Sequence, residues 1–550
     1  MKTITSCVFP VIFSEKFAWR TPLNAALAAV SVVSVTSACA AASERPSGSN
    51  ADGVSVRAAG VVIQSDPDRP RPPFDFSDED ADLLGDVQRG ALAYFIHEVD
   101  PATGLVRDRS GADLISVAGV GYQLAAYAIG AERGWMDRAD AEARAEKVLR
   151  SLLDQPSNRK AGLFYHFLNP GDASPRRLGT ELVVSTIDSA ILFAGAIVAG
   201  EFFGGDIERL ADGMVAEADW TFFLNGKVDF ERGDAPSPDR GFLSLGWRPA
   251  SDEDPTGEGT LIPYSWVDCG DEHRLATLIA VCAPNADHRV APETYYQLRR
   301  QIGVNPAAED ESLVVWFPYS GALFTAFFAH CWVDYASIGV DDPAAFGVDH
   351  RARVDWWENS RRLARLQRDK AIANPEGLPT FGPDAWGLSA CDGPDGYLVP
   401  GVFPERVEMI GAKPGRDFPE HDPSDQWGGG VVAPYAAASS VVFEPGLSLR
   451  AMRHFRGLEG PVGERLAWMG SPDQPVAAGA RGRYGFVDSY RGGSDPWRAT
   501  DTVAIDHGPM LVLLENARSG LVWDLFHRDA SVRAGLERLG LRRAAGSRDD

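Results

Sequence analysis

Residues 182–195, Leu-Val-Val-Ser-Thr-Ile-Asp-Ser-Ala-Ile-Leu-Phe-Ala-Gly, decide the fold. Small and apolar side chains dominate this stretch and its continuation to residue 203, and a helix that is apolar all round is a buried helix. Five other stretches have the same character. They are residues 116–135, 271–283, 320–335, 433–443 and 506–517. The sequence therefore predicts six buried helices.

Charged, amphipathic segments alternate with these stretches. They are residues 78–100, 139–155, 206–224, 292–302, 354–373, 446–458 and 521–540. Helices of this kind have one apolar and one solvated face, so the alternation predicts an inner ring of helices within an outer ring. We therefore predict an all-α fold, an (α/α)6 barrel or toroid. A superhelical α-solenoid is the competing architecture, but no repeat of fixed period supports it.

Three long connections, residues 225–270, 374–432 and 460–505, are rich in Gly, Pro, Trp, Tyr and Asp. Each of them leads into a predicted inner helix. Loops of this length within a compact domain usually carry function. We expect them to gather at one mouth of the barrel as long active-site loops that build a groove.

The N-terminus has the layout of a secretory leader. Basic residues precede an apolar run at 23–35, and small residues surround Cys39, so we predict a signal peptide at 1–39. Lipoprotein processing at Cys39 and ordinary cleavage at an A-x-A site both fit the pattern. Residues 40–73 predict a disordered polar linker, and residues 74–550 a single domain. We expect an exported protein, either periplasmic or an outer-membrane lipoprotein.

The formal net charge of the chain is −24. The leader contributes three basic residues and one acidic residue, a net +2, so the remainder carries −26. Such a body would repel nucleic acid and anionic lipid surfaces but not a neutral glycan. The four cysteines beyond Cys39 contain no CxxC pair, which indicates neither a zinc site nor a dense disulfide framework. We expect no metal, no cofactor, membrane contact only through a lipid anchor, and a monomer.

The stretch from Leu261 to Glu272, Leu-Ile-Pro-Tyr-Ser-Trp-Val-Asp-Cys-Gly-Asp-Glu, delivers aromatic rings and three carboxylates to the start of an apolar helix. Pyranose rings stack on Trp and Tyr, and cleaving a glycosidic bond needs a pair of carboxyl groups. The segment therefore suggests carbohydrate chemistry. An ordinary helix N-terminus, where Asp and Glu are favoured, explains the carboxylates equally well.

Two carboxyl groups are candidates for catalysis. Asp188 lies within the apolar stretch 182–203, where a carboxylate is costly unless it is paired or used. A structural pair with an arginine is the alternative. Glu272 is our candidate for the general acid, because a Glu beside aromatic surface can keep its proton at neutral pH. Asp271, the adjacent residue, points about 100° away on a helix, so one of the two is expected to be structural.

Aromatic residues next to carboxylates recur in several predicted loops. We expect sugar-binding roles for Tyr264, Trp266, Asp271, Trp332, Trp386, Asp392 and Phe486. A turn Asp or a helix N-cap beside a core aromatic is the simpler explanation of any single pair, and Asp506 best fits a plain cap. No GxSxG, Walker, HExxH or dinucleotide-binding motif is present.

Several strings resemble the bacterial glucoamylase-like domain family. They are Thr103-Gly-Leu-Val-Arg-Asp-Arg109, Gly162-Leu-Phe-Tyr-His166, Ser185-Thr-Ile-Asp188, Gly270-Asp-Glu272, Trp386-Gly-Leu-Ser-Ala390 and Tyr484-Gly-Phe-Val-Asp488. The resemblance runs from about residue 82 to residue 541. It implies an (α/α)6 glycoside hydrolase similar to the inverting β-1,2-glucanases and to a domain of cyclic β-1,2-glucan synthases. It also implies that Glu272 is the general acid and that Asp188 is an acidic residue of the active site.

The sequence thus predicts an exported glycoside hydrolase that cleaves a β-linked glucan, with β-1,2-glucan as the favoured substrate. Glu272 would be the acid, and Asp188 would hold or activate water. Two alternatives stay open at this point. A transglycosylase on the same scaffold would transfer the sugar to another sugar, and a glycan-binding lipoprotein would keep the aromatic groove without catalysis.

Overall fold

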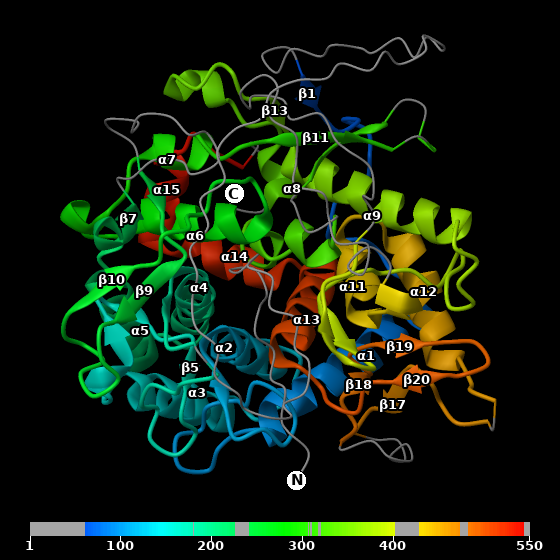
Figure 1. Ribbon diagram of the computed structural model, residues 1–550, viewed down its shortest axis with the longest axis horizontal. Helices are drawn as coiled ribbons and strands as arrows, with labels where there is room; N and C mark the ends of the chain where they lie inside the picture. The colour runs from blue at the N-terminus through cyan, green and yellow to red at the C-terminus, as the bar shows by residue number, and fades with distance from the viewer. Residues whose placement is uncertain are drawn as a thin grey trace, which may run out of the picture. The chain divides into compact units, whose positions relative to one another are not determined.

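The computed structural model describes residues 61–179, 181–225, 241–305, 307–308, 311–316, 321–401, 428–461, 463–472 and 482–543 (Figure 1). The predicted signal peptide and residues 40–60 of the predicted linker lie outside this range. Helices supply most of the regular structure, and the described strands are only two to four residues long. The prediction of an all-α class is confirmed.

The inner helices match the apolar stretches at five of six places. They are α2 (Val117–Glu132), α4 (Thr186–Phe203), α6 (Asp271–Cys282), α11 (Pro434–Ser439) and α13 (Ala504–Arg518). Nearly every residue of these helices is buried, as expected for helices that are apolar all round. Helix α4 is long and apolar enough to cross a membrane, but 83% of that window is buried within the protein, as in a core helix.

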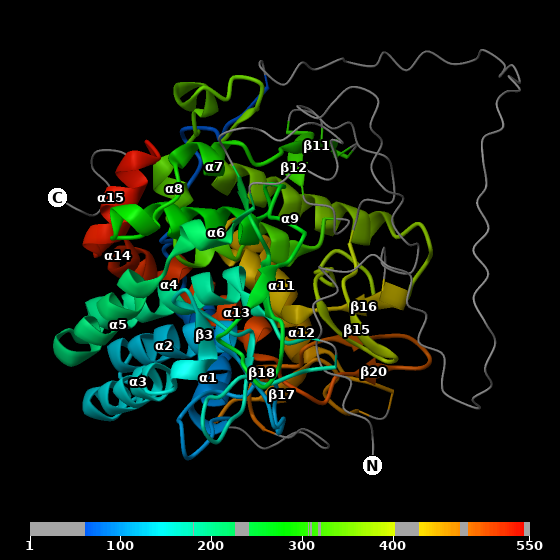
Figure 2. The ribbon, with the colours of Figure 1, turned by 60° about the vertical axis from the view of Figure 1, so that its left-hand side comes forward.

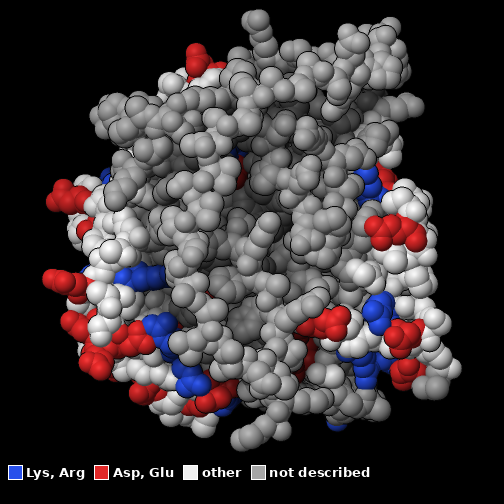
Figure 3. Space-filling view, in the orientation of Figure 1, with Lys and Arg blue, Asp and Glu red and all other residues white. Residues whose placement is uncertain are grey.

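Polar-faced helices pack on these buried helices from outside. They are α1 (Asp78–His97), α3 (Arg138–Leu153), α5 (Gly205–Glu217), α9 (Trp356–Ala373), α12 (Pro445–Gly457), α14 (Leu521–Arg528) and α15 (Ala530–Arg538). Helix α3 contacts α2, α5 contacts α4, α12 contacts α11, and α1 contacts α13. On the face drawn in Figure 3, the described acidic side chains are interspersed with basic ones and form no single patch.

The prediction of a continuous helix at 320–335 is wrong. From residue 321 the described segment contains η6 (Leu323–Ala326), η7 (Ala329–Cys331) and the start of α8 (Tyr335–Ile338). Side chains of other elements bind backbone groups that a continuous helix would pair internally. Asp271 accepts hydrogen bonds from the Ala329 and His330 N–H groups, and Trp523 donates to the His330 carbonyl.

The predicted helix at 292–302 is also only partly formed. Helix α7 (Pro292–Tyr296) ends early, and β11 (Gln301–Val304) follows and pairs antiparallel with β12 (Leu313–Trp316). The β-branched residues in both segments favour a strand over the continuation of a helix.

Short strands fix the points at which the inner helices begin. Strand β2 (Ile115–Ser116) pairs with β5 (Phe167–Leu168) directly before α2. Strand β6 (Val184–Ser185) pairs with β9 (Gly246–Pro249) directly before α4, and β9 also pairs with β10 (Gly259–Leu261). The other described strands are β3 (Arg159–Lys160), β4 (Leu163–Phe164), β7 (Leu224–Asn225), β8 (Phe242–Leu243), β14 (Cys391–Gly393), β15 (Gly396–Leu398), β16 (Val431–Val432), β17 (Trp468–Gly470), β18 (Gly485–Phe486), β19 (Tyr490–Arg491) and β20 (Trp497–Arg498).

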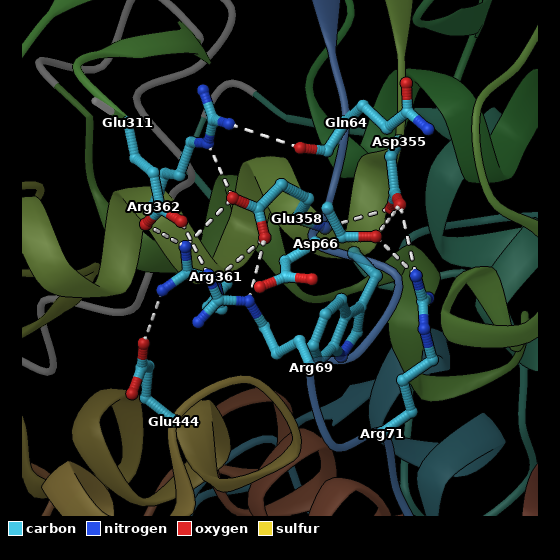
Figure 4. A network of polar contacts seen from close by, with 12 residues as sticks. Gln64, Asp66, Arg69, Arg71, Glu311, Asp355, Glu358, Arg361, Arg362 and Glu444 are labelled. Atoms are coloured by element: carbon cyan, nitrogen blue, oxygen red, sulfur yellow. Dashed lines mark hydrogen bonds and ion pairs between the residues drawn. The ribbon is translucent and has the colours of Figure 1, made fainter.

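Residues 61–73 are ordered, which corrects their assignment to a disordered linker. Strand β1 (Val62–Ile63) pairs in parallel with β13 (Arg353–Val354) and buries Ile63. Beyond it, Arg69 and Arg71 reach an ion-pair network on α9 (Figure 4). Polar composition suggested a solvated segment, but the two arginines have carboxylate partners on the folded body.

The centre of that network is Glu358, which is fully buried on α9. It accepts hydrogen bonds from Arg361 at 2.8 and 2.9 Å and from Arg362 at 2.7 Å. Arg361 also pairs with Glu311 and, at 2.7 Å, with Glu444 (Figure 4). The network therefore joins the N-terminal segment, Glu311 two residues before β12, helix α9 and the residue before α12.

Helices α2 and α4 cross in backbone contact at two glycines. A Cβ atom on Gly195 would lie 1.9 Å from the Gly121 carbonyl oxygen, and one on Gly121 would lie 2.3 Å from the Ile191 carbonyl oxygen. Figures 1 and 2 show α2, α4 and α6 following one another, and α4 contacts both of its neighbours. Glycine is required here for close approach.

We expect Gly195→Ala to destabilise the fold by several kcal/mol, because its methyl group would force the two helices apart. Gly213→Ala is the matched control. Gly213 is exposed in the middle of α5, and a Cβ atom there would meet nothing within 4 Å, so its replacement should be neutral or stabilise by up to about 1 kcal/mol. Chemical denaturation of both variants measures the difference, and equal stability would contradict the close crossing.

Candidate active site

Glu272 is the second residue of α6, and its side chain is buried. Its Oε2 atom has no hydrogen-bond partner in the described structure. Burial, followed by repulsion from Asp188 and Asp271, raises the pKa of Glu272 to about 8. A carboxyl group with this pKa holds a proton at neutral pH and can donate it.

Asp271, one residue earlier, has a structural role. It pairs with Arg274, accepts the Ala329 N–H at 2.9 Å and lies 2.8 Å from His330 Nδ1. Burial alone would raise the pKa of Asp271, but Arg274 and His330 hold it below its usual value. The prediction that it binds substrate stays a prediction, whereas the expectation that one of the two adjacent carboxyl groups is structural fits this geometry.

Asp188 lies in the first turn of α4, buried beside a histidine that the sequence did not single out. The Asp188 N–H donates to the capping Ser185 hydroxyl at 3.3 Å, and Asp188 Oδ1 lies 3.5 Å from His166 Nε2. On the other side of the ring, His166 Nδ1 lies 2.6 Å from Glu181 Oε1. The arginine partner considered for Asp188 is thus replaced by the imidazole of His166.

The electrostatic balance of Asp188 differs from that of Glu272. Burial raises the pKa of Asp188, but His166 and the hydrogen bond with Ser185 oppose this rise. Because ionised Asp188 raises the pKa of Glu272, the two carboxyl groups interact electrostatically. Their surroundings therefore favour charge on Asp188 and a proton on Glu272.

Two of the three long loops meet at Asp392, which Arg109 binds. Arg109 binds both carboxylate oxygens of Asp392, at 2.9 and 3.1 Å. The Asp392 N–H donates to Asp488 at 2.7 Å, which joins loop 374–432 to loop 460–505. Asp392, predicted to bind substrate, is thus held by protein groups in this structure.

Asp108, adjacent to Arg109, is a further buried carboxyl group near the site. Burial raises the pKa of Asp108 to about 7, although His166 lowers it. The sequence contained Asp108, Arg109 and His166 within strings that resemble the family, but no local rule distinguished them. The proximity of these residues to Asp188 depends on tertiary structure.

Asp488 and Asp506 form a second pair of interacting carboxyl groups. Burial and mutual repulsion raise the pKa of Asp506 well above its usual value. Tyr435, whose hydroxyl donates to the Ala390 carbonyl at 2.7 Å, opposes this rise in the pKa of Asp506. The expectation that Asp506 is a plain helix cap is therefore wrong, since α13 begins after Val503 and no side chain caps it.

Four of the five predicted sugar platforms are buried. They are Trp266, Trp332, Trp386 and Phe486, exposed by 3%, 0%, 1% and 0%. Trp332 stacks on Tyr122 with ring centroids 5.4 Å apart, and Trp266 donates to the Thr186 hydroxyl at 2.8 Å. These four rings pack within the protein in this structure, and their role as sugar platforms stays a prediction. Tyr264, by contrast, is 42% exposed.

No cluster of three or more His, Cys, Asp or Glu residues suited to a metal ion occurs in the described part of the chain. The site described above combines carboxyl groups with the imidazoles of His166 and His330 and the guanidinium groups of Arg109 and Arg274. Such groups can move protons and hold sugar hydroxyls.

Residues 263–530 match the family model described as "Putative glucoamylase". This part of the chain is similar to the glucoamylase-like family. The predicted family resemblance is therefore confirmed. The glucoamylase-like region includes Glu272, Asp392, Asp488 and Asp506, whereas Asp188 and His166 precede it.

The chain is also similar to proteins with curated names. An exo-β-1,2-glucooligosaccharide sophorohydrolase (non-reducing end) of Parabacteroides distasonis is 22% identical over 497 residues, which cover 84% of this chain and 58% of the relative. The chain thus spans little more than half the length of that relative.

Solved structures show the same fold. An endo-β-1,2-glucanase from Chitinophaga pinensis, in complex with sophorotriose and glucose, has a TM-score of 0.64 at 22% identity, covering 84% of this chain and 98% of that one. A β-1,2-glucanase from Parabacteroides distasonis has a TM-score of 0.64 at 19% identity, covering 85% and 60%. The glucoamylase-like region and the helices before it share this fold.

We expect Glu272→Gln to stabilise the fold at alkaline pH. The pKa of Glu272 in the folded state lies above its ordinary value, so the wild-type fold loses stability as pH rises from about 4.5 through about 8. The neutral amide removes this loss. Chemical denaturation should find the variant near wild type at pH 5 and more stable by on the order of a few kcal/mol at pH 9.

The matched control is Glu208→Gln on the exposed face of α5. It makes the same chemical change without burial and should not alter the pH dependence of stability. If the gap between Glu272→Gln and wild type were equal at both pH values, Glu272 would not hold its proton in the folded state.

Proposed function

We propose that this protein is a glycoside hydrolase that cleaves β-1,2-glucan with water. The observation that carries this proposal is the buried Glu272, which keeps a proton near neutrality, has an unpartnered Oε2 atom and interacts electrostatically with Asp188. The likeness to a β-1,2-glucooligosaccharide sophorohydrolase and to β-1,2-glucanases supports the choice of substrate.

In the proposed reaction, Glu272 protonates the glycosidic oxygen of the leaving sugar. Asp188, held between Ser185 and His166, orients or activates the water that attacks the anomeric carbon. We propose inversion of configuration, in which acid and base lie on opposite sides of the sugar. The resemblance to inverting β-1,2-glucanases supports this stereochemistry, and NMR of the first-formed product anomer tests it.

We further propose that the helices close into an (α/α)6 barrel. The contacts between α2, α4 and α6, and those of α13 with α2, α11 and η7, support a closed inner ring. The packing of a polar-faced helix against most of these inner helices supports the second layer. In such a barrel, the meeting of loops 374–432 and 460–505 near Arg109 would form one wall of the substrate groove.

Export is part of the same proposal. The N-terminal basic residues, apolar run and Cys39 support secretion to the periplasm or anchoring as an outer-membrane lipoprotein. A polymeric substrate outside the cytoplasm would agree with that location. Labelling of wild type and Cys39→Ser with a fatty-acid analogue distinguishes a lipid anchor from simple cleavage.

We expect the full chain to release short β-1,2-linked oligosaccharides from linear β-1,2-glucan, and Glu272→Gln to lower turnover about 10²- to 10⁴-fold, the usual contribution of a general acid. The alkaline limb of the kcat/KM profile should lie near pH 8, because Glu272 must be protonated, and should disappear in the variant. Chromatography of the products measures both.

Glu208→Gln again serves as control and should keep wild-type turnover. Full activity of Glu272→Gln would contradict its assignment as the acid. Absence of products from wild type would reject β-1,2-glucan as the substrate, and longer or cyclic glucans among the products would replace hydrolysis by transglycosylation.

A further inference from the structure

His166 is held in place by its backbone and by stacking. Its N–H donates to the Val183 carbonyl at 2.9 Å, and its carbonyl accepts the Val117 N–H at 3.0 Å. The imidazole stacks on Phe167 with ring centroids 3.7 Å apart. The orientation of the ring is therefore set by the start of α2 and the strand before α4.

A carboxylate lies at each nitrogen of this fixed ring. Glu181 Oε1 is 2.6 Å from Nδ1, and Asp188 Oδ1 is 3.5 Å from Nε2. A neutral imidazole has one N–H group and one lone pair, so one nitrogen would face a carboxylate without a proton between them. Only the imidazolium presents an N–H group to both, and the geometry therefore favours the cation.

We propose that His166 is a positioning residue whose positive charge keeps Asp188 ionised and thereby keeps the catalytic proton on Glu272. This inference rests on the proposed hydrolase function. In this inference His166, which is neither the acid nor the base, controls which of the two carboxyl groups carries the proton.

The charges around the three residues support this assignment. Burial alone would lower the pKa of His166, but Asp188, Glu181 and Asp108 raise it to about 9. The imidazolium is the largest effect that opposes the raised pKa of Asp188. Glu272 in turn is acted on by ionised Asp188 and by Asp271.

Asp271 does not compete for the proton, because Arg274 and His330 already compensate its charge. If His166 lost its charge, burial and repulsion from Glu181 would raise the pKa of Asp188. A protonated Asp188 would no longer repel a charge on Glu272. The pKa values of the pair would then approach each other, and the distinct roles of acid and base would be lost.

The first test is the pH profile of kcat/KM for His166→Gln on linear β-1,2-glucan. Glutamine keeps an N–H donor but carries no charge. Because an opposite charge at this range shifts a carboxyl pKa by about 1–3 units, the acidic limb should move up and the alkaline limb down, each by about one unit. KM should change less than kcat, and Glu208→Gln should leave both limbs in place.

Glu181→Gln is the second variant, which tests the inference even if His166→Gln fails to fold. It leaves the contact between His166 and Asp188 intact and removes a carboxylate that raises the pKa of Asp188, so the acidic limb should move down, opposite to its shift in His166→Gln. A purely structural role for His166 would lower activity at every pH without moving the limbs. Active variants with wild-type limbs would overturn the inference.

NMR titration of labelled histidines separates this inference from the proposed function, because it needs no substrate. The His166 resonance is identified among the 10 histidines by its loss in His166→Gln. This resonance should show that the His166 imidazole stays protonated above pH 8. Asp188→Asn should lower the pKa of His166 by one unit or more. An imidazole that titrates near 6.5 would overturn the inference, whereas an imidazolium in a protein without β-1,2-glucanase activity would contradict only the substrate.

Discussion

The backbone contact between α2 and α4 at Gly121 and Gly195 is the constraint on which the site depends. Because neither glycine has a side chain at the crossing, no change of rotamer can compensate for a movement of one helix against the other. The two helices therefore have one relative position. The strands that precede these helices, β2 and β6, are therefore fixed as well. Backbone hydrogen bonds join His166 to Val183 and Val117. The position of its ring therefore depends on the crossing of α2 and α4. The distance from the imidazole to Asp188 is thus a consequence of helix packing.

Burial then gives chemically similar carboxyl groups different properties. Asp271 and Glu272 are adjacent and equally buried, but only Asp271 has a guanidinium and an imidazole as partners. Its charge is stable, and that charge adds to the repulsion that keeps Glu272 protonated. A carboxylate with a structural role thereby contributes to the acidity of its neighbour. This division follows from the 100° between successive side chains on a helix.

The sequence predicted those features that depend on local periodicity. The apolar runs gave five inner helices, and burial of Asp188 and Glu272 followed from their place in such runs. Prediction from the sequence failed where tertiary partners replace local hydrogen bonds, as at Ala329 and His330. It also failed where an arginine pairs with a carboxylate far away in the sequence, as at Arg69. The burial of Trp332 and Trp386 was not predicted for a related reason, since composition cannot tell whether the face of an aromatic ring is covered.

His166 illustrates the same limit of local patterns, because its role comes from groups that lie 15 and 22 residues away along the chain. Around it the structure gathers Asp108, Glu181 and Asp188, with Glu272 next to Asp188, against few positive charges. In a site with more carboxyl groups than cations, full ionisation is unfavourable, and some protons must remain bound at neutral pH. The position of the single imidazolium decides which carboxyl group loses its proton first. Several carboxyl groups around one fixed cation can therefore provide both a charged carboxylate and a proton donor from the same residue types.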